Sequence, residues 1–181
     1  IRRTLSGLHC DWLRNLSEDF WISEFYPNLD GWKKSITPED IRLRLWSLLA
    51  HGAKKILFWQ YRAERVGNES NGHGLVEING EGNERTTEVE KMLGIVKKNR
   101  EILRTFKVRA AEVALIYSQR SDLISHIESI EGDSFTSMGT YTSHGRNYKD
   151  SLSGSYALFW ENNIPVDIIS IHEVKRIHSY K

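Results

Sequence analysis

The sequence predicts an α/β fold built on parallel strands. Stretches with helical spacing of apolar residues alternate with short, nearly continuous apolar runs, and this alternation is typical of a sheet covered by helices. Strands are expected at residues 20–25, 56–59, 113–117 and 166–169. The pattern restarts after a charged stretch near residue 107, which predicts a second domain.

The N-terminal residues predict a helix over 3–16, because leucines and a tryptophan recur there at three- and four-residue spacing on one face. The aromatic run that follows, Phe20-Trp21-Ile22-Ser23-Glu24-Phe25, is typical of a strand buried on both faces of a parallel sheet. Pro27, Asn28, Asp30 and Gly31 predict that a loop follows it.

The next helix has a recognisable start and end. Thr37 suits the N-cap and Pro38 the first turn, and the acidic residues after them favour the positive end of the helix dipole. Gly52 follows the last periodic residue and is a candidate C-cap. The apolar stripe between these ends consists of Ile41, Leu45, Leu48 and Leu49.

The rest of the first segment predicts a strand at 56–59, a polar loop at 62–87 and a helix at 88–104, with Met92, Val96 and Leu103 on its inner face. In the second segment a strand at 113–117 precedes a helical stretch that contains Leu123, Ile124, Ile127 and Ile130. A Gly/Ser/Thr-rich loop at 132–147, a helix at 148–162 and a strand at 166–169 complete a β-α-β unit of doubly wound type.

Composition excludes several classes of protein. The 181 residues carry a formal charge of +1, so no net field attracts nucleic acid or an anionic membrane. No apolar run approaches the ~20 residues that span a bilayer, and no signal peptide is visible, so a cytoplasmic location is expected. The one cysteine, Cys10, is expected to be a small core residue. Because the chain begins at Ile1, it is expected to be a fragment or a processed product.

Chemistry is expected at the carboxyl ends of the strands, where parallel α/β folds place their sites. Glu24 lies at the end of the first strand, and burying a carboxylate there is costly unless it is paired or functional. Two explanations are open from the residues alone: a catalytic carboxylate, or a structural ion pair with an arginine such as Arg62.

Several motifs in order resemble glycoside hydrolase family 42 β-galactosidases over about residues 5–104. They are Trp21-Ile22-Ser23-Glu24-Phe25-Tyr26-Pro27, Gly31-Trp32, Ala50-His51-Gly52-Ala53, Phe58-Trp59-Gln60-Tyr61-Arg62 and Glu69-Ser70-Asn71-Gly72-His73-Gly74. The resemblance implies the C-terminal part of a TIM (β/α)8 barrel, with strands seven and eight and their helices, over residues 1–107. Residues 108–181 then resemble the start of a flavodoxin-like or amidotransferase-like trimerisation domain.

The resemblance also implies roles for particular residues. Glu24 matches the nucleophile of a retaining β-galactosidase, which forms a covalent glycosyl–enzyme intermediate and needs no cofactor. Trp32 matches a sugar-stacking platform, and Glu69 and His73 match residues that bind galactose hydroxyls, although the spacing between these two departs by about one residue from the family pattern. The implied partners are a galactoside substrate and, in the full-length protein, two further copies in a homotrimer.

The second carboxyl group of the reaction is missing from the expected place. In the family the acid/base glutamate follows an asparagine at the end of the fourth barrel strand, and no matching Asn-Glu pair precedes Glu24. The fragment alone is therefore expected to be inactive. A second hypothesis is a non-catalytic oligomerisation or sugar-binding module. A third, a nucleotide binder, is disfavoured because Ser118-Gln119-Arg120-Ser121 stands where a Gly-rich phosphate loop would lie.

Overall fold

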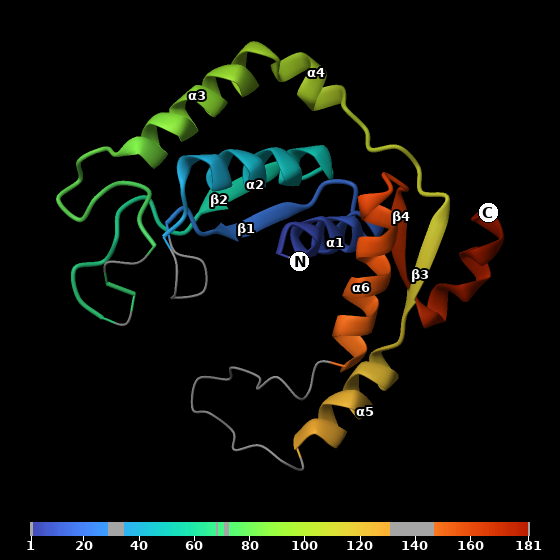
Figure 1. Ribbon diagram of the computed structural model, residues 1–181. Helices are drawn as coiled ribbons and strands as arrows, with labels where there is room; N and C mark the ends of the chain where they lie inside the picture. Colours follow the sequence, from blue (N-terminus) through green and yellow to red (C-terminus); the bar gives the residue numbers. More distant parts are fainter. Residues whose placement is uncertain (1, 29–34, 68, 71–72, 131–146, 181) are drawn as a thin grey trace. The chain divides into compact units, whose positions relative to one another are not determined.

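The computed structural model describes residues 2–28, 35–67, 69–70, 73–130 and 147–180 (Figure 1). It confirms the predicted mixed α/β class. The chain divides into two compact units, one formed by residues 17–108 and the other by residues 1–16 together with 109–181. Trp32 and nearly all of the loop expected at 132–147 lie outside the described residues. No helix in the described ranges is both long and apolar enough to cross a membrane.

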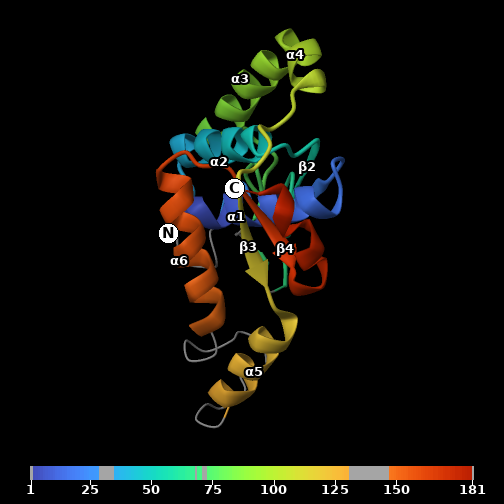
Figure 2. The ribbon, with the colours of Figure 1, turned by 90° about the vertical axis from the view of Figure 1, so that its right-hand side faces the viewer.

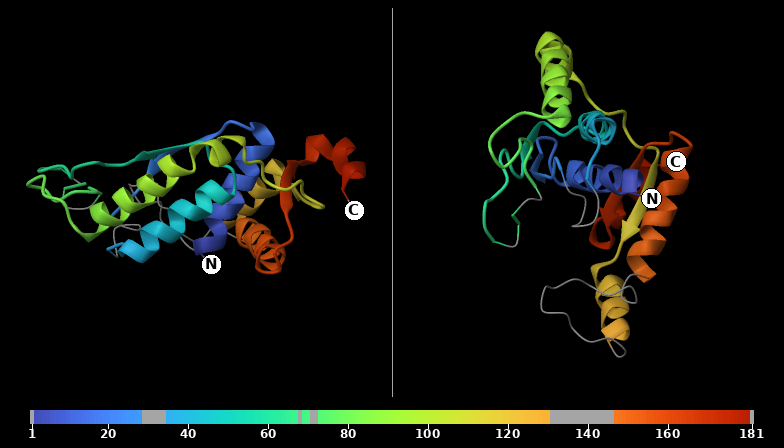
Figure 3. Two further views of the ribbon diagram at one scale, coloured as in Figure 1. Left: turned by 90° about the horizontal axis from the view of Figure 1, so that it is seen from above. Right: turned by 60° about the vertical axis from the view of Figure 1, so that its left-hand side comes forward.

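The unit of residues 17–108 is built on two parallel strands, β1 (Trp21–Phe25) and β2 (Lys55–Phe58), with Trp21 opposite Lys55 and Phe25 opposite Phe58. Helix α2 (Pro38–Ala50) connects the strands, and α3 (Glu84–Lys98) and α4 (Arg100–Thr105) follow β2. Helices α2 and α3 pack side by side (Figure 3).

The predicted N-cap of α2 is confirmed, and Gly52, the expected C-cap, lies one residue beyond the observed C-cap, His51. The Thr37 hydroxyl accepts the amide of Asp40 at 3.2 Å, while the Asp40 carboxylate accepts the Thr37 amide at 3.4 Å, so two orphan donors are satisfied reciprocally. At the other end Gly52 has φ 98° and donates its amide to the Leu49 carbonyl at 3.0 Å, a left-handed C-terminal conformation that favours glycine. The face between them buries Ile41, Leu45 and Leu48.

Strand β1 is less buried than the sequence predicted. Phe25 is buried, but Trp21, Ser23 and Glu24 are exposed. The expectation of burial on both faces was therefore wrong for this strand. Burial on both faces requires elements packed above and below a sheet, and among the described residues the exposed side chains of β1 lack such cover.

The helix predicted at 88–104 begins four residues earlier and is interrupted. Helix α3 begins at Glu84 because the Asn83 side chain accepts the amides of Arg85 and Thr86, at 2.9 and 3.2 Å, which makes Asn83 the N-cap. Asn99 separates α3 from α4. The periodic apolar stripe did not reveal the start at Glu84 or the break at Asn99, because a cap is a local polar signal that apolar periodicity does not contain. The last helical residue, Thr105, lies one position beyond the predicted end at 104.

The second unit contains parallel strands β3 (Val113–Tyr117) and β4 (Val166–Ser170), which lie side by side in Figure 2. Helices α5 (Gln119–Ile130) and α6 (Asn147–Glu161) connect them, a 3-10 helix, η2 (Ile171–Ser179), follows β4, and α1 (Arg2–Leu16) packs against β4 and α6. The buried core of this unit consists of Leu8, Tyr156, Val166 and Ile168. Helix α1 belongs to this unit, whereas the expected domain limits of 1–107 and 108–181 group it with the other segment.

A polar network joins α1 to the rest of this unit. Asp11 is buried, accepts the Tyr156 hydroxyl at 2.6 Å and pairs with Arg14. Arg14 also contacts Asp167 of β4 at 3.2 Å, and Asp167 accepts the Tyr180 hydroxyl at 2.9 Å. Helix α1 is thus bound to α6 and β4 by charge-assisted hydrogen bonds as well as by apolar packing.

We expect the stability of this unit to fall as the pH rises from about 10 to about 12. Burial, followed by a hydrogen bond to Asp167, raises the pKa of Tyr180 to about 12, whereas an unfolded tyrosine titrates near 10. The folded state then binds the proton more tightly in this interval, so its stabilisation is complete below pH 10 and disappears as the pH passes 12. Urea midpoints at pH 8, 10 and 11.5 should decline less in Tyr180→Phe than in the unaltered chain, and equal declines would contradict the assignment.

Candidate active site at the carboxyl ends of β1 and β2

The carboxyl ends of β1 and β2 lie at the same edge of their sheet because the strands are parallel. The amide of Trp59, the first residue after β2, donates to the Phe25 carbonyl at 2.9 Å. Glu24 is the penultimate residue of β1 and its side chain is exposed. The Glu24 carboxylate therefore lies at the edge of the sheet where the loop after β2 begins.

Tyr26 is the hydrogen-bond partner of Glu24. Its hydroxyl donates to Glu24 Oε2 at 2.6 Å. The two residues are two positions apart on extended chain, so their side chains leave the same face. This hydrogen bond is the main cause that raises the pKa of Tyr26 to about 12, followed by burial and by the negative charges of Glu24 and Glu69. At neutral pH the phenol is consequently protonated and is the donor.

The loop after β2 brings Glu69 and His73 to the same place. The Trp59 indole donates from Nε1 to Glu69 Oε2 at 2.7 Å. The Gln60 amide donates to the His73 carbonyl at 2.9 Å, which returns the loop to the strand end. The buried His73 ring packs against the Tyr26 ring with 5.0 Å between centroids. Tyr26 thus contacts both Glu24 and His73, and the negative charge of Glu69 also acts on its hydroxyl.

We expect Gly74→Ala to disrupt this loop. A Cβ at Gly74 would lie 2.4 Å from the Ala63 amide nitrogen and 2.8 Å from the Val76 carbonyl oxygen. Both distances are steric clashes with backbone atoms, so the backbone must move to accommodate an alanine. The chain at His73 would move with them. Limited proteolysis should cleave the 60–76 loop faster in this variant, whereas Gly94→Ala, on an open face of α3, provides the matched control. Equal cleavage rates would show that the close approach is unimportant.

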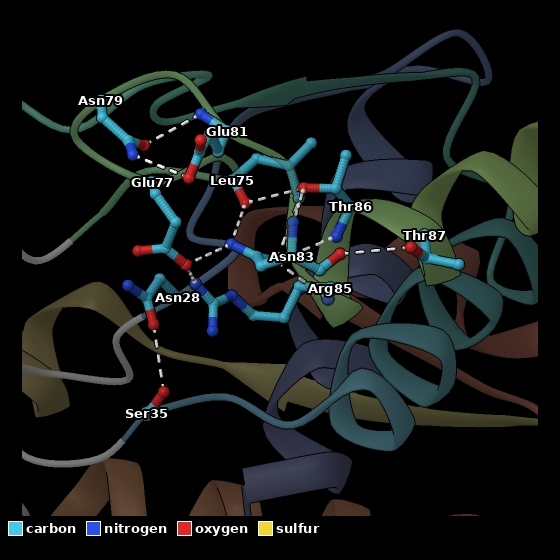
Figure 4. Close-up of polar contacts among 10 residues, drawn as sticks. All are labelled: Asn28, Ser35, Leu75, Glu77, Asn79, Glu81, Asn83, Arg85, Thr86 and Thr87. Atoms are coloured by element: carbon cyan, nitrogen blue, oxygen red, sulfur yellow. Dashed lines mark hydrogen bonds and ion pairs between the residues drawn. The ribbon is translucent and has the colours of Figure 1, made fainter.

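The far end of the same loop is fixed on helix α3. The Asn83 amide group donates to the Leu75 carbonyl at 3.0 Å and to Glu77 Oε1 at 2.7 Å while its oxygen caps the helix (Figure 4). Thr86 donates its hydroxyl to the same Leu75 carbonyl at 3.2 Å. One asparagine therefore connects the loop that carries Glu69 and His73 to the helix that follows it.

Gln60, which follows the end of β2, has a structural partner. Gln60 donates from Nε2 to Glu64 at 3.1 Å. The alternative of an ion pair between Glu24 and Arg62 does not match the structure, in which the hydrogen bond to Glu24 comes from Tyr26. Across the described ranges no three His, Cys, Asp or Glu side chains are grouped as in a metal site.

Comparison with known families shows to which family the chain belongs. The glycoside hydrolase 42 family model, described as Beta-galactosidase, matches residues 3–99, which is more than half of the chain. The chain belongs to the glycoside hydrolase family 42 β-galactosidases. The family resemblance expected from the motifs is thereby confirmed.

Curated relatives of this family 42 chain agree with that membership. It is 28% identical over 170 residues to "Beta-galactosidase GanA" of Bacillus subtilis and 31% identical over 170 residues to "Beta-galactosidase GalA" of Bacillus licheniformis. Each alignment covers 91% of this chain and 23% of the relative. The chain therefore spans about a quarter of the length of the relatives it matches.

Solved structures show the same likeness. Gan42B, a family 42 β-galactosidase from G. stearothermophilus, matches with a TM-score of 0.70 and 25% identity over 93% of this family 42 chain and 24% of that chain. The β-galactosidase of Bacillus circulans sp. alkalophilus matches with a TM-score of 0.73 and 21% identity, over 98% of this chain and 25% of its own, which supports the fold.

For this family 42 chain, sequence reasoning missed Tyr26 and Trp59 as parts of the candidate site. A signal for Tyr26 was present, because residues i and i+2 of an extended segment share a face and Tyr26 follows Glu24 by two. Trp59 had no such signal, since its bond to Glu69 depends on the course of a ten-residue loop segment.

Proposed function

We propose that this chain is the segment of a retaining β-galactosidase that carries the catalytic nucleophile, Glu24. Residues 1–107 then contribute the seventh and eighth strands of a TIM barrel with their helices, and residues 108–181 begin the domain through which the full-length protein forms a homotrimer. The observation that carries the proposal is the exposed Glu24 carboxylate at the carboxyl end of a parallel strand, in a chain of family 42.

The first step of the proposed reaction joins Glu24 to the sugar. One carboxylate oxygen forms a bond to the anomeric carbon as the bond to the leaving oxygen breaks, and the leaving oxygen takes a proton from a second carboxyl group about 5–5.5 Å from the first. Water then attacks the anomeric carbon, the sugar–Glu24 bond breaks, and the second group accepts the proton. We propose that this second carboxyl group, the acid/base, belongs to a part of the full-length protein outside this chain.

Substrate binding is assigned to Glu69, His73 and Trp32. The Glu69 carboxylate can accept hydrogen bonds from sugar hydroxyls, and the Trp59 indole fixes one of its oxygens at 2.7 Å. His73 offers ring nitrogens as donor or acceptor. Trp32, outside the described residues, is proposed to stack on the apolar face of the galactosyl ring.

Azide rescue of a Glu24→Gly variant of the full-length protein tests this function. With 2,4-dinitrophenyl β-galactoside, azide should enter the space of the missing carboxylate and restore turnover, giving α-galactosyl azide. A β-galactosyl azide product would identify Glu24 as the acid/base instead. If the unaltered full-length protein binds galactose but hydrolyses no galactoside or arabinopyranoside, the non-catalytic sugar-binding function replaces this one.

A further inference from the structure

We propose that Tyr26 is a positioning residue that holds the Glu24 carboxylate and accelerates the second step of the reaction, in which the sugar–Glu24 bond breaks. The inference rests on the proposed function, because it requires Glu24 to be the nucleophile. It is carried by the 2.6 Å hydrogen bond from the Tyr26 hydroxyl to Glu24 Oε2 and by the contacts that fix Tyr26.

The hydrogen bond makes the two carboxylate oxygens of Glu24 inequivalent. Tyr26 engages Oε2, which leaves Oε1 as the oxygen that attacks the anomeric carbon. A hydrogen bond to one oxygen also restricts rotation of the carboxylate about its last torsion angle. Glu24 is exposed, so without such a donor its side chain would sample several orientations.

Tyr26 is itself held from two directions. Its ring packs on the buried His73 with 5.0 Å between centroids. Its backbone carbonyl accepts from Arg44 Nη1 of α2 at 3.3 Å, and the same guanidinium lies 4.8 Å from the centre of the Phe25 ring. A phenol fixed at both ring and backbone can restrict a neighbouring carboxylate, whereas a mobile phenol would not.

Charge around Tyr26 keeps its hydroxyl protonated. The hydrogen bond to Glu24, burial, and the negative charges of Glu24 and Glu69 raise the pKa of Tyr26 to about 12. It can therefore donate to Glu24 throughout the neutral range.

The two chemical steps use this donor differently. In the first step Glu24 loses negative charge as its oxygen bonds to the anomeric carbon, so a hydrogen bond to the charged carboxylate gives no rate advantage beyond orientation. In the second step water bonds to that carbon, the electron pair of the sugar–Glu24 bond returns to the carboxylate, and the water proton goes to the acid/base group. A donor already aimed at the carboxylate stabilises this returning charge.

The test compares Tyr26→Phe with the unaltered full-length enzyme. With 2,4-dinitrophenyl β-galactoside, whose good leaving group makes the second step rate-limiting, kcat should fall roughly 10- to 100-fold, and KM should fall with it. An enzyme trapped with an activated 2-deoxy-2-fluoro-galactoside should reactivate more slowly by a similar factor. Tyr61→Phe, which removes a hydroxyl from a side chain that is 69% exposed, is the matched control and should reactivate at the unaltered rate.

Reactivation is a first-order process of trapped molecules, so its rate constant is independent of the fraction of protein that folds. An unchanged reactivation rate in Tyr26→Phe, or equal losses of kcat and kcat/KM, would overturn the role of Tyr26. Absence of a trapped intermediate on Glu24 in the unaltered enzyme would instead overturn the proposed function, so the two failures are distinguishable.

Discussion

Glu24→Gln is expected to lower kcat of the full-length enzyme by roughly four orders of magnitude or more. The amide cannot form the covalent glycosyl ester, whereas its shape matches the carboxylate and its oxygen can still accept the Tyr26 hydroxyl. The side chain is exposed, so the fold has no buried charge to lose at this position. Loss of rate should therefore occur without loss of structure.

Steady-state kinetics with p-nitrophenyl β-galactoside, together with thermal unfolding, checks this expectation. Glu18→Gln makes the same chemical change at an exposed position outside the site and should retain full activity. If Glu24→Gln kept more than about a tenth of the activity, a nucleophilic role would be excluded, because no step of the covalent route can proceed on an amide.

Asp11→Ala is expected to produce the largest loss of stability, about 3 kcal/mol or more. Asp11 is 4% exposed, accepts the Tyr156 hydroxyl at 2.6 Å and pairs with Arg14. Its removal leaves a buried phenol without its acceptor and deprives a half-buried guanidinium of one of its two carboxylates. Both effects weaken the attachment of α1 to α6 and β4.

Urea unfolding and hydrogen exchange of peptides that contain β4 measure this loss. Asp11→Asn keeps the size and an acceptor oxygen and should lose less than Asp11→Ala. Glu128→Ala, on an exposed position of α5, should change the free energy of unfolding by no more than about 0.5 kcal/mol. A loss below 1 kcal/mol for Asp11→Ala would mean that the network contributes little beyond apolar packing.

Local signals predicted much of the fold. The strand at 113–117, the N-cap Thr37 and Gly52 all depend on residues adjacent in sequence, and the structure has each of them. The packing partner of α1 was not predictable in this way. Its apolar stripe shows that one face must be buried but contains no information on which sheet covers it. The packing partner is fixed by contacts of Asp11 and Arg14 with residues more than 140 positions away in the sequence.

The candidate site shows the same division. Glu24 was singled out as a carboxylate at the end of an apolar run, and its expected role as nucleophile came from the resemblance to family 42 motifs. The contacts that orient it were not identified, since His73 reaches Tyr26 only through a loop that closes on Gln60. Periodicity and motif spacing predict where elements and site residues lie along the chain. Contacts such as that between His73 and Tyr26 depend on the path of a loop in space, which these signals do not contain.

Peptide mapping by mass spectrometry after reaction of the full-length enzyme with an activated 2-deoxy-2-fluoro-galactoside tests the central claim most directly. We expect one fluorogalactosyl group per subunit, attached to Glu24 in the peptide that contains Trp21-Ile22-Ser23-Glu24-Phe25-Tyr26. Attachment of the group to Glu69 or to any other residue would contradict the assignment of Glu24 as the nucleophile.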